Sequence, residues 1–196
     1  MNAWDLIVIG AGAVGSAALR AASEAGARVL GLERFAPAHR RGSSHGLSRI
    51  YRHAYFEHPD YVPLLRHSSA RFASLECESG TSLRHRCGML LMGPHDSTVV
   101  RGSLDSATRW QLDVAALDAR SKCEPFPWFD VNGEVMGAFE REAGLVRPEA
   151  TVHASLRVAC GRVARLRTDV CVQQVSEDEC GVSVVTDLGT ERAAAV

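Results

Sequence analysis

An α/β fold organised around a parallel sheet is predicted by two observations near the start of the chain. The apolar, β-branched run from Leu6 to Ile9 is too short for a buried helix and is typical of a buried parallel strand. A glycine turn of the pattern Gly-x-Gly-x-x-Gly follows at once, with Gly10, Gly12 and Gly15. A strand, this turn and a helix in that order are typical of a Rossmann-like dinucleotide-binding unit.

Each glycine of the turn has its own physical role. Gly10 permits the tight turn, Gly12 lets a pyrophosphate approach the backbone, and Gly15 lets the helix pack close to the strand. The phosphates would lie on the N-terminus of the helix, so the backbone at Ala13 and Val14 is expected to contact them as well.

The residues after the turn complete the unit. A helix is expected from Ala13 to Ala25 and ends at Gly26, and a second apolar strand follows from Arg28 to Leu32. That strand leads to Glu33, where a carboxylate would bind the ribose hydroxyls and disfavour a 2′-phosphate. The dinucleotide is therefore expected to be FAD or NAD rather than NADP. The alternative, a strand-turn-helix unit that binds nothing, explains fewer of these features.

Composition excludes several classes of protein. The chain has 196 residues, 46% of them hydrophobic, which is enough for one domain or for a piece of something larger. With 22 basic and 23 acidic residues there is no electrostatic case for binding nucleic acid or an anionic membrane. No run of 18 or more residues is apolar, and the start MNAWDL lacks the pattern of a secretory signal, so a cytoplasmic protein is expected.

The cysteines and histidines give no support for a metal site. The six cysteines are irregularly spaced without a Cys-x-x-Cys pair, and the eight histidines include no His-x-x-x-His pair. The cysteines are expected to be free thiols, several of them buried as small hydrophobic side chains: Cys77, Cys87, Cys123, Cys160, Cys171 and Cys180.

Residues 35–63 are expected to form a loop dense in cations. Its GSSHG core, with Gly42, Ser43 and Ser44, offers backbone donors and hydroxyls to an anionic or polar ligand. The arginines and histidines crowded into this segment also indicate nearby anions: His39, Arg40, Arg41, His45, Arg49, Arg52 and His53.

The segment LGLERFAPAHRRGSSHGLSRIYRHAYFEHPDYVPLL resembles the monomeric sarcosine oxidase group, which includes N-methyltryptophan oxidase and pipecolate oxidase. The later segments CGMLLMGPHDS and GLVRPEA resemble the same group, so the likeness spans the chain. It favours FAD over NAD. It also implies an FAD-binding Rossmann-like domain of the glutathione-reductase type, with part of an inserted α+β substrate domain.

The resemblance implies a role for several residues. His45 and Arg49 would lie against the flavin ring, Arg52 would bind the substrate carboxylate, and the backbone near Val172 would lie against the adenine. Arg34, next to Glu33, joins the expected cofactor contacts. A planar guanidinium pairs bidentately with a carboxylate, and a cation beside the flavin can stabilise negative charge on it.

Less specific interpretations remain open for these side chains. Arg49 and Arg52 would also fit surface ion pairs, and His45 a structural hydrogen bond within the loop. The other cations and histidines of the segment are expected to be solvated loop residues: His39, Arg40, Arg41, His53 and His58.

The remaining elements follow from hydrophobic pattern and from breakers. Expected helices are Tyr61–Cys77, Val99–Trp110, a short one around Leu117, and one with Pro148 in its first turn and Glu149 near its positive end. Expected strands are Cys87–Gly93, Glu134–Phe139, Cys171–Val175, Val182–Thr186 and a buried parallel strand over Glu191–Val196. Polar turns are expected at Glu78–Arg86 and Ser176–Gly181, and Cys123–Phe129 is expected not to be helical throughout.

These expectations define a domain order and an activity. Residues 1–83 and 145–196 would belong to the FAD-binding domain, and residues 84–144 to the substrate domain. In the family roughly as much chain again follows, so the resemblance implies a C-terminally truncated protein that lacks the covalent flavin cysteine and most of the substrate sheet. Such a chain is expected to be weakly active or inactive without a complementing C-terminal half.

The reaction implied for the complete protein is oxidation of the C–N bond of a secondary or N-methyl amino acid to an imine, with O2 reduced to H2O2. Three alternatives stay open: a nicotinamide-dependent dehydrogenase, a non-catalytic dinucleotide-binding fragment, and an amine dehydrogenase that uses another electron acceptor.

Overall fold

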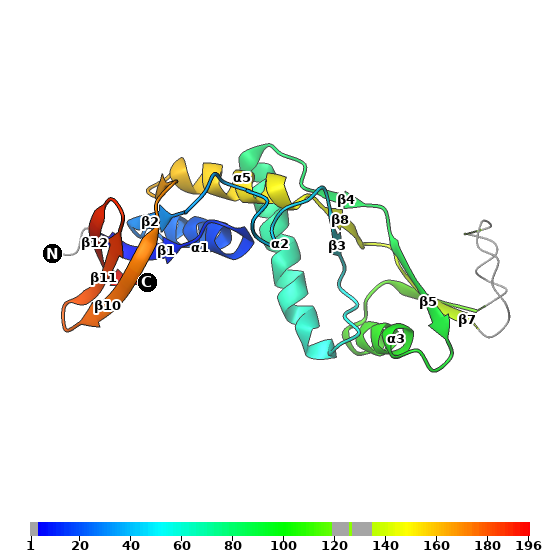
Figure 1. Ribbon diagram of the computed structural model, residues 1–196. Helices are drawn as coiled ribbons and strands as arrows, with labels where there is room; N and C mark the ends of the chain where they lie inside the picture. Colours follow the sequence, from blue (N-terminus) through cyan, green and yellow to red (C-terminus); the bar gives the residue numbers. More distant parts are fainter. Residues whose placement is uncertain (1–3, 119–125, 127–134) are drawn as a thin grey trace. The chain divides into compact units, whose positions relative to one another are not determined.

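The computed structural model describes residues 4–118, 126 and 135–196, and Figure 1 shows their helices and strands. The chain divides into two compact units. Unit 1 comprises Met1–Ser48, Ser74–Leu83 and Arg147–Val196, and unit 2 comprises Arg49–Ala73 and Arg84–Val146. The domain boundaries expected from the sequence stay a prediction.

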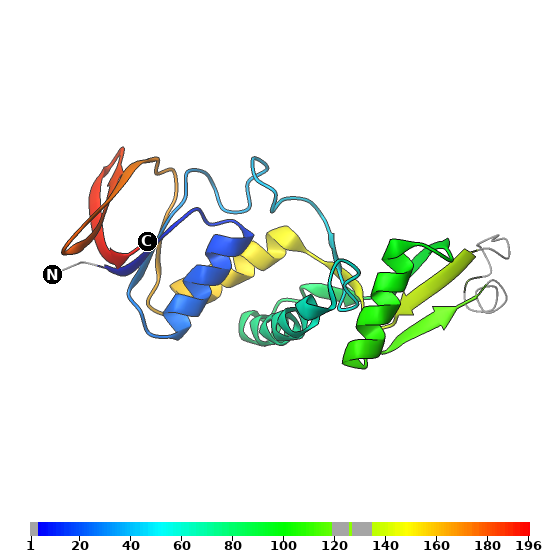
Figure 2. The ribbon, with the colours of Figure 1, turned by 90° about the horizontal axis from the view of Figure 1, so that it is seen from below.

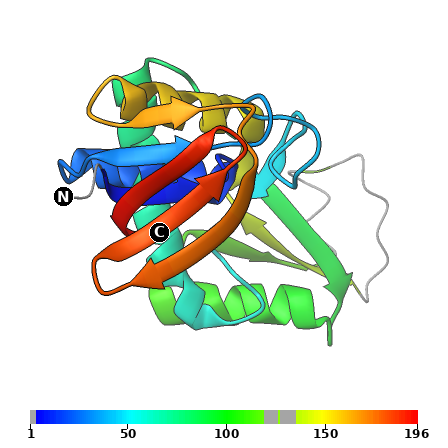
Figure 3. The same cartoon turned by 60° about the vertical axis from the view of Figure 1, so that its left-hand side comes forward.

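Unit 1 is built on a six-stranded sheet with the order β10-β11-β12-β1-β2-β9. β1 pairs in parallel with β2 and β12, β2 pairs in parallel with β9, and β10, β11 and β12 form an antiparallel meander that is prominent in Figure 3. The strands are β1 (Trp4–Ile9), β2 (Val29–Leu32), β9 (Arg165–Arg167), β10 (Val172–Asp178), β11 (Gly181–Thr186) and β12 (Gly189–Ala195).

Two helices cover one face of this sheet. α1 (Ala13–Glu24) and α5 (Pro148–Cys160) lie side by side in Figures 1 and 2. Because successive side chains of a strand point to opposite faces, β2 feeds two clusters: Val29 packs with residues of α1 and α5, while Leu30 packs with Ile7 on the other face. The predicted sequence of strand, turn, helix and strand is confirmed.

The chain buries its first and last strands less than the sequence predicts. All four residues of β2 are buried, but Ile7 is the one fully buried residue of β1 and Ala193 that of β12. β12 does pair in parallel with β1, as expected, with Trp4 opposite Ala193.

The described residues of unit 2 form two three-stranded sheets. One has the order β3-β8-β4 and the other the order β5-β7-β6, with α3 lying along the second sheet in Figure 2. The elements of the unit are β3 (Arg49–Tyr51), η1 (Pro59–Tyr61), β4 (Arg84–Arg86), β5 (Met89–Pro94), α3 (Thr98–Trp110), β6 (Val114–Leu117), β7 (Val135–Glu140) and β8 (Gly144–Val146). α2 (Val62–Ser79) starts in unit 2, and its residues from Ser74 onward belong to unit 1.

Several local predictions are wrong, each because sheet pairing outweighs local preference. The segment around Leu117 is strand β6 and not a helix, since its alanine-rich sequence pairs antiparallel with β7. The expected turn at Glu78–Arg86 contains β4, and the expected loop at residues 35–63 contains β3. The turn expected at Ser176–Gly181 is shorter, because β10 and β11 continue pairing up to Asp178 and Gly181. The expectation for Cys123–Phe129 falls almost wholly outside the described residues.

The cysteines also differ from expectation. Cys77, Cys87, Cys160 and Cys180 are exposed and Cys171 is half-buried, so the prediction that several are buried is wrong for these five. Cys77 and Cys160 lie near the ends of helices, and the other three lie in segments that connect strands. Cys123 lies outside the described part of the chain. Within that part, no helix is long and apolar enough to cross a membrane, and no cluster of three or more His, Cys, Asp or Glu side chains could hold a metal ion.

Candidate dinucleotide site

The glycine turn joins β1 to the N-terminus of α1 in a conformation that other residues could not adopt. Gly10 has φ of 89°, in the left-handed region, and a Cβ on Gly15 would lie 1.8 Å from the carbonyl oxygen of Gly10. Gly12 is the N-cap of α1 and makes no side-chain cap. Val14, in the first turn, is 85% exposed. This helix N-terminus therefore presents backbone N–H groups to an approaching anion.

Glu33 lies buried beyond the end of β2, and only 4% of its surface is exposed. Its Oε2 accepts a hydrogen bond from the Ala11 N–H at 2.7 Å, and its Oε1 accepts one from the Phe35 N–H at 2.9 Å. His39 Nε2 lies 3.3 Å from the same Oε1. Because His39 Nδ1 accepts the Arg41 N–H at 3.0 Å, the proton is on Nε2, which donates to Glu33. His39 is thus half-buried and bonded, and its description as a solvated loop residue is wrong.

The GSSHG segment folds back onto the start of α1. Ser44 Oγ accepts the Ala13 N–H at 2.9 Å. His45 Nδ1 donates to the Gly42 carbonyl oxygen at 2.5 Å, which is the structural hydrogen bond that the sequence left open for this histidine. The Gly46 N–H donates to Glu149 Oε1 at 2.8 Å, a partner that the sequence did not indicate.

The arrangement of unit 1 fits a dinucleotide. The glycines place no side chains of their own at the turn, where the Glu33 carboxylate accepts the Ala11 N–H and the Ser44 hydroxyl accepts the Ala13 N–H. The Phe35 ring lies 4.5 Å from the Arg41 guanidinium carbon and 5.4 Å from that of Arg34, so both cations lie over the ring of a residue whose N–H donates to Glu33. Hydrogen bonds thus link Glu33 and Ser44, two of the predicted site residues, to the glycine turn.

Val172 is the predicted residue farthest from this group in sequence. It is half-buried at the start of β10 and packs against the core cluster that contains Ile7 and Leu30. Its contact with an adenine stays a prediction.

Arg52 in unit 2 is held by an aromatic pair and one carboxylate. Its guanidinium carbon lies 4.7 Å from the Tyr55 ring centroid and 4.8 Å from that of Phe56, and its Nη2 lies 3.1 Å from both oxygens of Glu57. The side chain is 18% exposed, and its buried Nε has no partner within the described residues. Arg52 therefore makes an ion pair, as one interpretation of the sequence allows, in which the guanidinium is largely buried and the Glu57 side chain is 42% exposed.

A cavity of about 370 Å³ adjoins Arg52. Arg49 is the first residue of β3, and Arg52 follows the last residue of that strand. Arg49 is exposed and lies opposite Val146 of β8. The cavity is lined by Ile50, Tyr51, Arg52, Tyr55, Leu65, Ser68, Phe72 and Val146.

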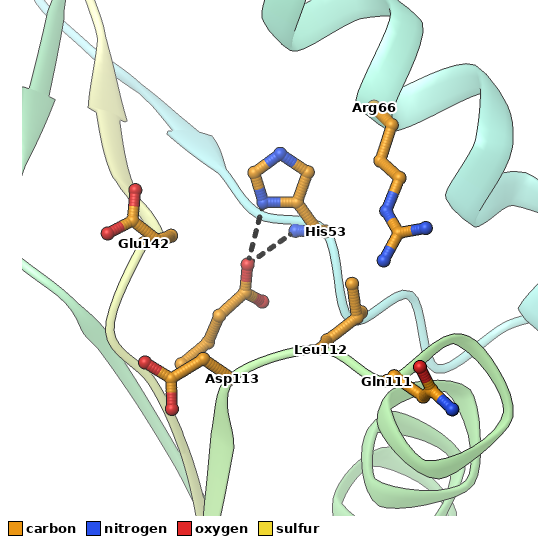
Figure 4. Close-up of a pocket in the computed structure, with 7 residues that line it drawn as sticks. His53, Arg66, Gln111, Leu112, Asp113 and Glu142 are labelled. Carbon is orange, nitrogen blue, oxygen red and sulfur yellow. Dashed lines mark hydrogen bonds and ion pairs between the residues drawn. The ribbon is translucent and has the colours of Figure 1, made fainter.

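A second cavity of about 220 Å³ adjoins His53, as Figure 4 shows. Glu140, at the end of β7, accepts the His53 N–H at 2.7 Å, the Ala54 N–H at 2.9 Å and His53 Nδ1 at 3.0 Å. Burial is the largest single influence on the pKa of Glu140 and opposes ionisation, but together these hydrogen bonds lower the pKa. In Figure 4 Asp113 and Glu142 lie on one side of His53 and Arg66 on the other. His53 is therefore a half-buried, bonded side chain and not the solvated loop residue that the sequence suggests.

A hydrogen-bonded chain leads from Glu140 toward the first cavity. His53 Nε2 lies 3.2 Å from the Tyr51 hydroxyl, which is bonded at 2.5 Å to Ser69 Oγ. Arg84 Nη1 donates to the same Ser69 hydroxyl at 3.1 Å. Glu140 gave no signal in the sequence, because a glutamate that ends an apolar strand is ordinarily a solvated residue.

Comparison with known proteins identifies the family. The model of the FAD dependent oxidoreductase family matches residues 5–196. This chain belongs to that family. The match confirms the predicted resemblance, the α/β fold class and FAD as the cofactor, and it decides against a nicotinamide-dependent dehydrogenase.

Relatives within the FAD-dependent oxidoreductase family are similar over the whole chain. Monomeric sarcosine oxidase of Streptomyces avermitilis is 43% identical over 97% of this chain and 50% of its own length. N-methyl-L-tryptophan oxidase of Yersinia pestis is 36% identical over 98% of this chain and 52% of its own length. The chain thus spans about half the length of the curated relatives it matches.

Solved structures of amino acid oxidases share the fold. The open form of NikD, an amino acid oxidase essential for nikkomycin biosynthesis, superposes with a TM-score of 0.85 at 27% identity, covering 99% of this chain and 50% of NikD. L-proline dehydrogenase from P. horikoshii superposes with a TM-score of 0.82 at 17% identity, covering 100% of this chain and 53% of the dehydrogenase, a likeness of fold alone.

Proposed function

We propose that this chain supplies the FAD site of a cytoplasmic oxidase that converts the C–N bond of a secondary or N-methyl amino acid to an imine and reduces O2 to H2O2. One observation carries the proposal: the glycine turn, the Glu33 carboxylate and the Ser44 hydroxyl converge at the N-terminus of α1. Partners are the small amino acid, O2 and a complementing C-terminal half, without which the chain is weakly active or inactive.

Unit 1 provides the cofactor contacts. The pyrophosphate would be bound by the backbone of the glycine turn and the start of α1, together with the GSSHG segment, and the ribose by Glu33. A carboxylate has about four acceptor positions, and Glu33 uses three of them, so one remains for a ribose hydroxyl. The proposed contacts are Gly10, Gly12, Ala13, Val14, Gly15, Glu33, Arg34, Gly42, Ser43, Ser44 and Val172.

The redox end of the site uses three further residues, His45, Arg49 and Arg52. FAD, when bound, supplies the two-electron chemistry of the reaction. His45 and Arg49 would lie against its ring, where the cation of Arg49 favours negative charge. Arg52 would hold the substrate carboxylate, and because its guanidinium is already paired with Glu57, the substrate would have to replace that carboxylate.

Calorimetric titration of the purified chain with FAD and with NAD tests the cofactor part of this proposal. FAD is expected to bind and NAD is expected neither to bind nor to compete. Equal binding of both dinucleotides would contradict an FAD site. For the reaction, peroxide release from the complete protein is measured with N-methyl and secondary amino acids. Arg52→Lys should raise KM for the amino acid more than it lowers kcat, since lysine lacks the bidentate geometry.

A further inference from the structure

Three hydrogen-bonded attachments join the loop that carries Ser44 and His45 to other parts of unit 1, in addition to the hydrogen bond of His45 to Gly42 within the loop. At its start, His39 bridges the Arg41 N–H and the Glu33 carboxylate. At its middle, Ser44 Oγ accepts the Ala13 N–H of α1. At its end, the Gly46 N–H donates to Glu149 Oε1 at 2.8 Å. The first two attachments belong to the glycine unit itself, whereas the third reaches a helix about a hundred residues further along the chain.

Glu149 is well placed to hold this end of the loop. It lies in the first turn of α5, directly after Pro148, where the helix N-terminus favours a negative charge. It is half-buried, so its hydrogen bond to Gly46 is partly shielded from water. α5 packs against α1, so the carboxylate is carried by the same helical layer that begins at the glycine turn.

Gly46 is matched to this contact. Its φ of 108° lies in the region that L residues rarely adopt, and this conformation directs its N–H toward Glu149 while the chain turns toward β3. The residue before it is His45. The imidazole of His45, which also donates to the Gly42 carbonyl oxygen, is therefore closer in sequence to this attachment than the Ser44 hydroxyl is.

We propose that Glu149 is a positioning residue for the flavin-facing end of the loop, acting through the Gly46 N–H. The inference rests on the proposed function, because it assumes that His45 lies against the flavin. Loss of the carboxylate leaves the attachments of His39 and Ser44 intact, so the adenosine diphosphate half of the cofactor keeps its contacts. The flavin half loses an ordered loop end, and FAD affinity falls while ADP affinity does not.

The test compares Glu149→Met and Glu149→Gln with the wild-type chain by calorimetry, using FAD and ADP as ligands. Methionine keeps the length and helix preference of the side chain but accepts no strong hydrogen bond, whereas glutamine keeps a neutral acceptor. Since the hydrogen bond lost is one to a charged group, Glu149→Met should raise the Kd for FAD about tenfold or more. Glu149→Gln should raise it about threefold, and the Kd for ADP should stay within about twofold in both.

Controls separate this role from a general effect on the fold. Glu179→Gln removes one negative charge from an exposed turn between β10 and β11 and should leave both dissociation constants unchanged. Hydrogen exchange at the Gly46 amide, measured by NMR without any cofactor, should accelerate in Glu149→Met.

Distinct outcomes would overturn the inference. An unchanged Kd for FAD in Glu149→Met contradicts it directly. Equal weakening of FAD and ADP would mean that α5 is merely destabilised, which also contradicts it. If the wild-type chain bound no FAD, the proposed function would fail and this inference with it. If the wild-type chain binds FAD but the exchange of the Gly46 amide is the same in Glu149→Met as in the wild type, only the inference is overturned.

Discussion

Glu33 in unit 1 and Glu140 in unit 2 are buried carboxylates with nearly the same partners. They are 4% and 3% exposed, and each accepts two backbone N–H groups and one imidazole nitrogen. Their surroundings differ. Glu33 lies beside the glycine turn and bonds to its Ala11 N–H, while Glu140 bonds to the N–H groups of the two residues that follow Arg52. Under the proposed function, Glu33 serves the cofactor because of the glycine turn beside it, whereas Glu140 serves the fold.

The largest effect is expected from Gly15→Ala, which disrupts the glycine turn that distinguishes the surroundings of Glu33 from those of Glu140. A Cβ at this position would lie 1.8 Å from the Gly10 carbonyl oxygen, so the backbone must move. The free energy of unfolding should fall by about 3 kcal/mol, as for severe overpacking. FAD binding should be lost, although Glu33 is intact. Urea denaturation and FAD titration measure both quantities, with Gly161→Ala as the matched substitution, since Gly161 has φ of −68°. Normal FAD binding by the Gly15→Ala variant would contradict the claim that the glycine turn is needed for the cofactor site beside Glu33.

Glu140→Gln should lower stability without affecting the cofactor. Glutamine has one acceptor oxygen, so one of the buried N–H groups of His53 and Ala54 loses its partner, which costs about 2 kcal/mol in the free energy of unfolding. The Kd for FAD should not change. Weaker FAD binding at unchanged stability would show that Glu140 is not the structural counterpart of Glu33.

The stabilisation by Glu140 should depend on pH in a defined direction. Because the pKa of Glu140 is lowered in the folded state, its contribution is fully present above the ordinary glutamate pKa of about 4.3 and is lost as the pH falls through the folded-state value. The difference in urea midpoint between wild type and Glu140→Gln should therefore be constant from neutral pH down to about pH 5 and shrink below about pH 4. A difference that grows on acidification would contradict this.

Glu33→Gln should affect the cofactor as well as the fold. The amide cannot accept a ribose hydroxyl and both N–H donors at once, so FAD affinity should fall about tenfold, the loss of one charge-assisted hydrogen bond. Calorimetry on the two single variants, Glu33→Gln and Glu140→Gln, compares the contributions of the two carboxylates to FAD affinity. Equal FAD affinity in the two variants would mean that Glu33 has no ribose role.

The smallest effect is expected from His39→Leu. His39 orients Glu33 from a half-buried position, at a 3.3 Å separation that makes a weak hydrogen bond. FAD affinity should fall about threefold, with the Glu33 backbone partners unchanged. Arg40→Leu, at an exposed neighbour, is the control and should have no effect.

Unit 1 could be predicted because its information is local. The glycine turn, the helix that follows it and Glu33 lie within one short segment, and each residue type has a single physical reason to be there. The sequence placed Ser44 near the cofactor from the composition of its loop, and the structure brings Ser44 to the Ala13 N–H.

Other features depend on partners that are distant in sequence. β3 and β4 are each three residues long and become strands because β8 pairs with both. The buried role of His53 depends on Glu140, and the loop attachment at Gly46 depends on Glu149. The sequence around Glu140 and Glu149 contains no pattern that indicates these contacts, because a single polar residue at the end of a strand or the start of a helix is ordinarily solvated. For the same reason, the sequence alone indicates solvated side chains at His39 and His53.

The visible absorption spectrum of the purified chain, recorded after incubation with FAD and desalting, tests the central claim most directly. Residues 1–196 contain the glycine turn, Glu33 and the Ser44 loop, so the account predicts a retained flavin band that Gly15→Ala abolishes. A folded but colourless wild-type chain would contradict the claim that these residues form an FAD site.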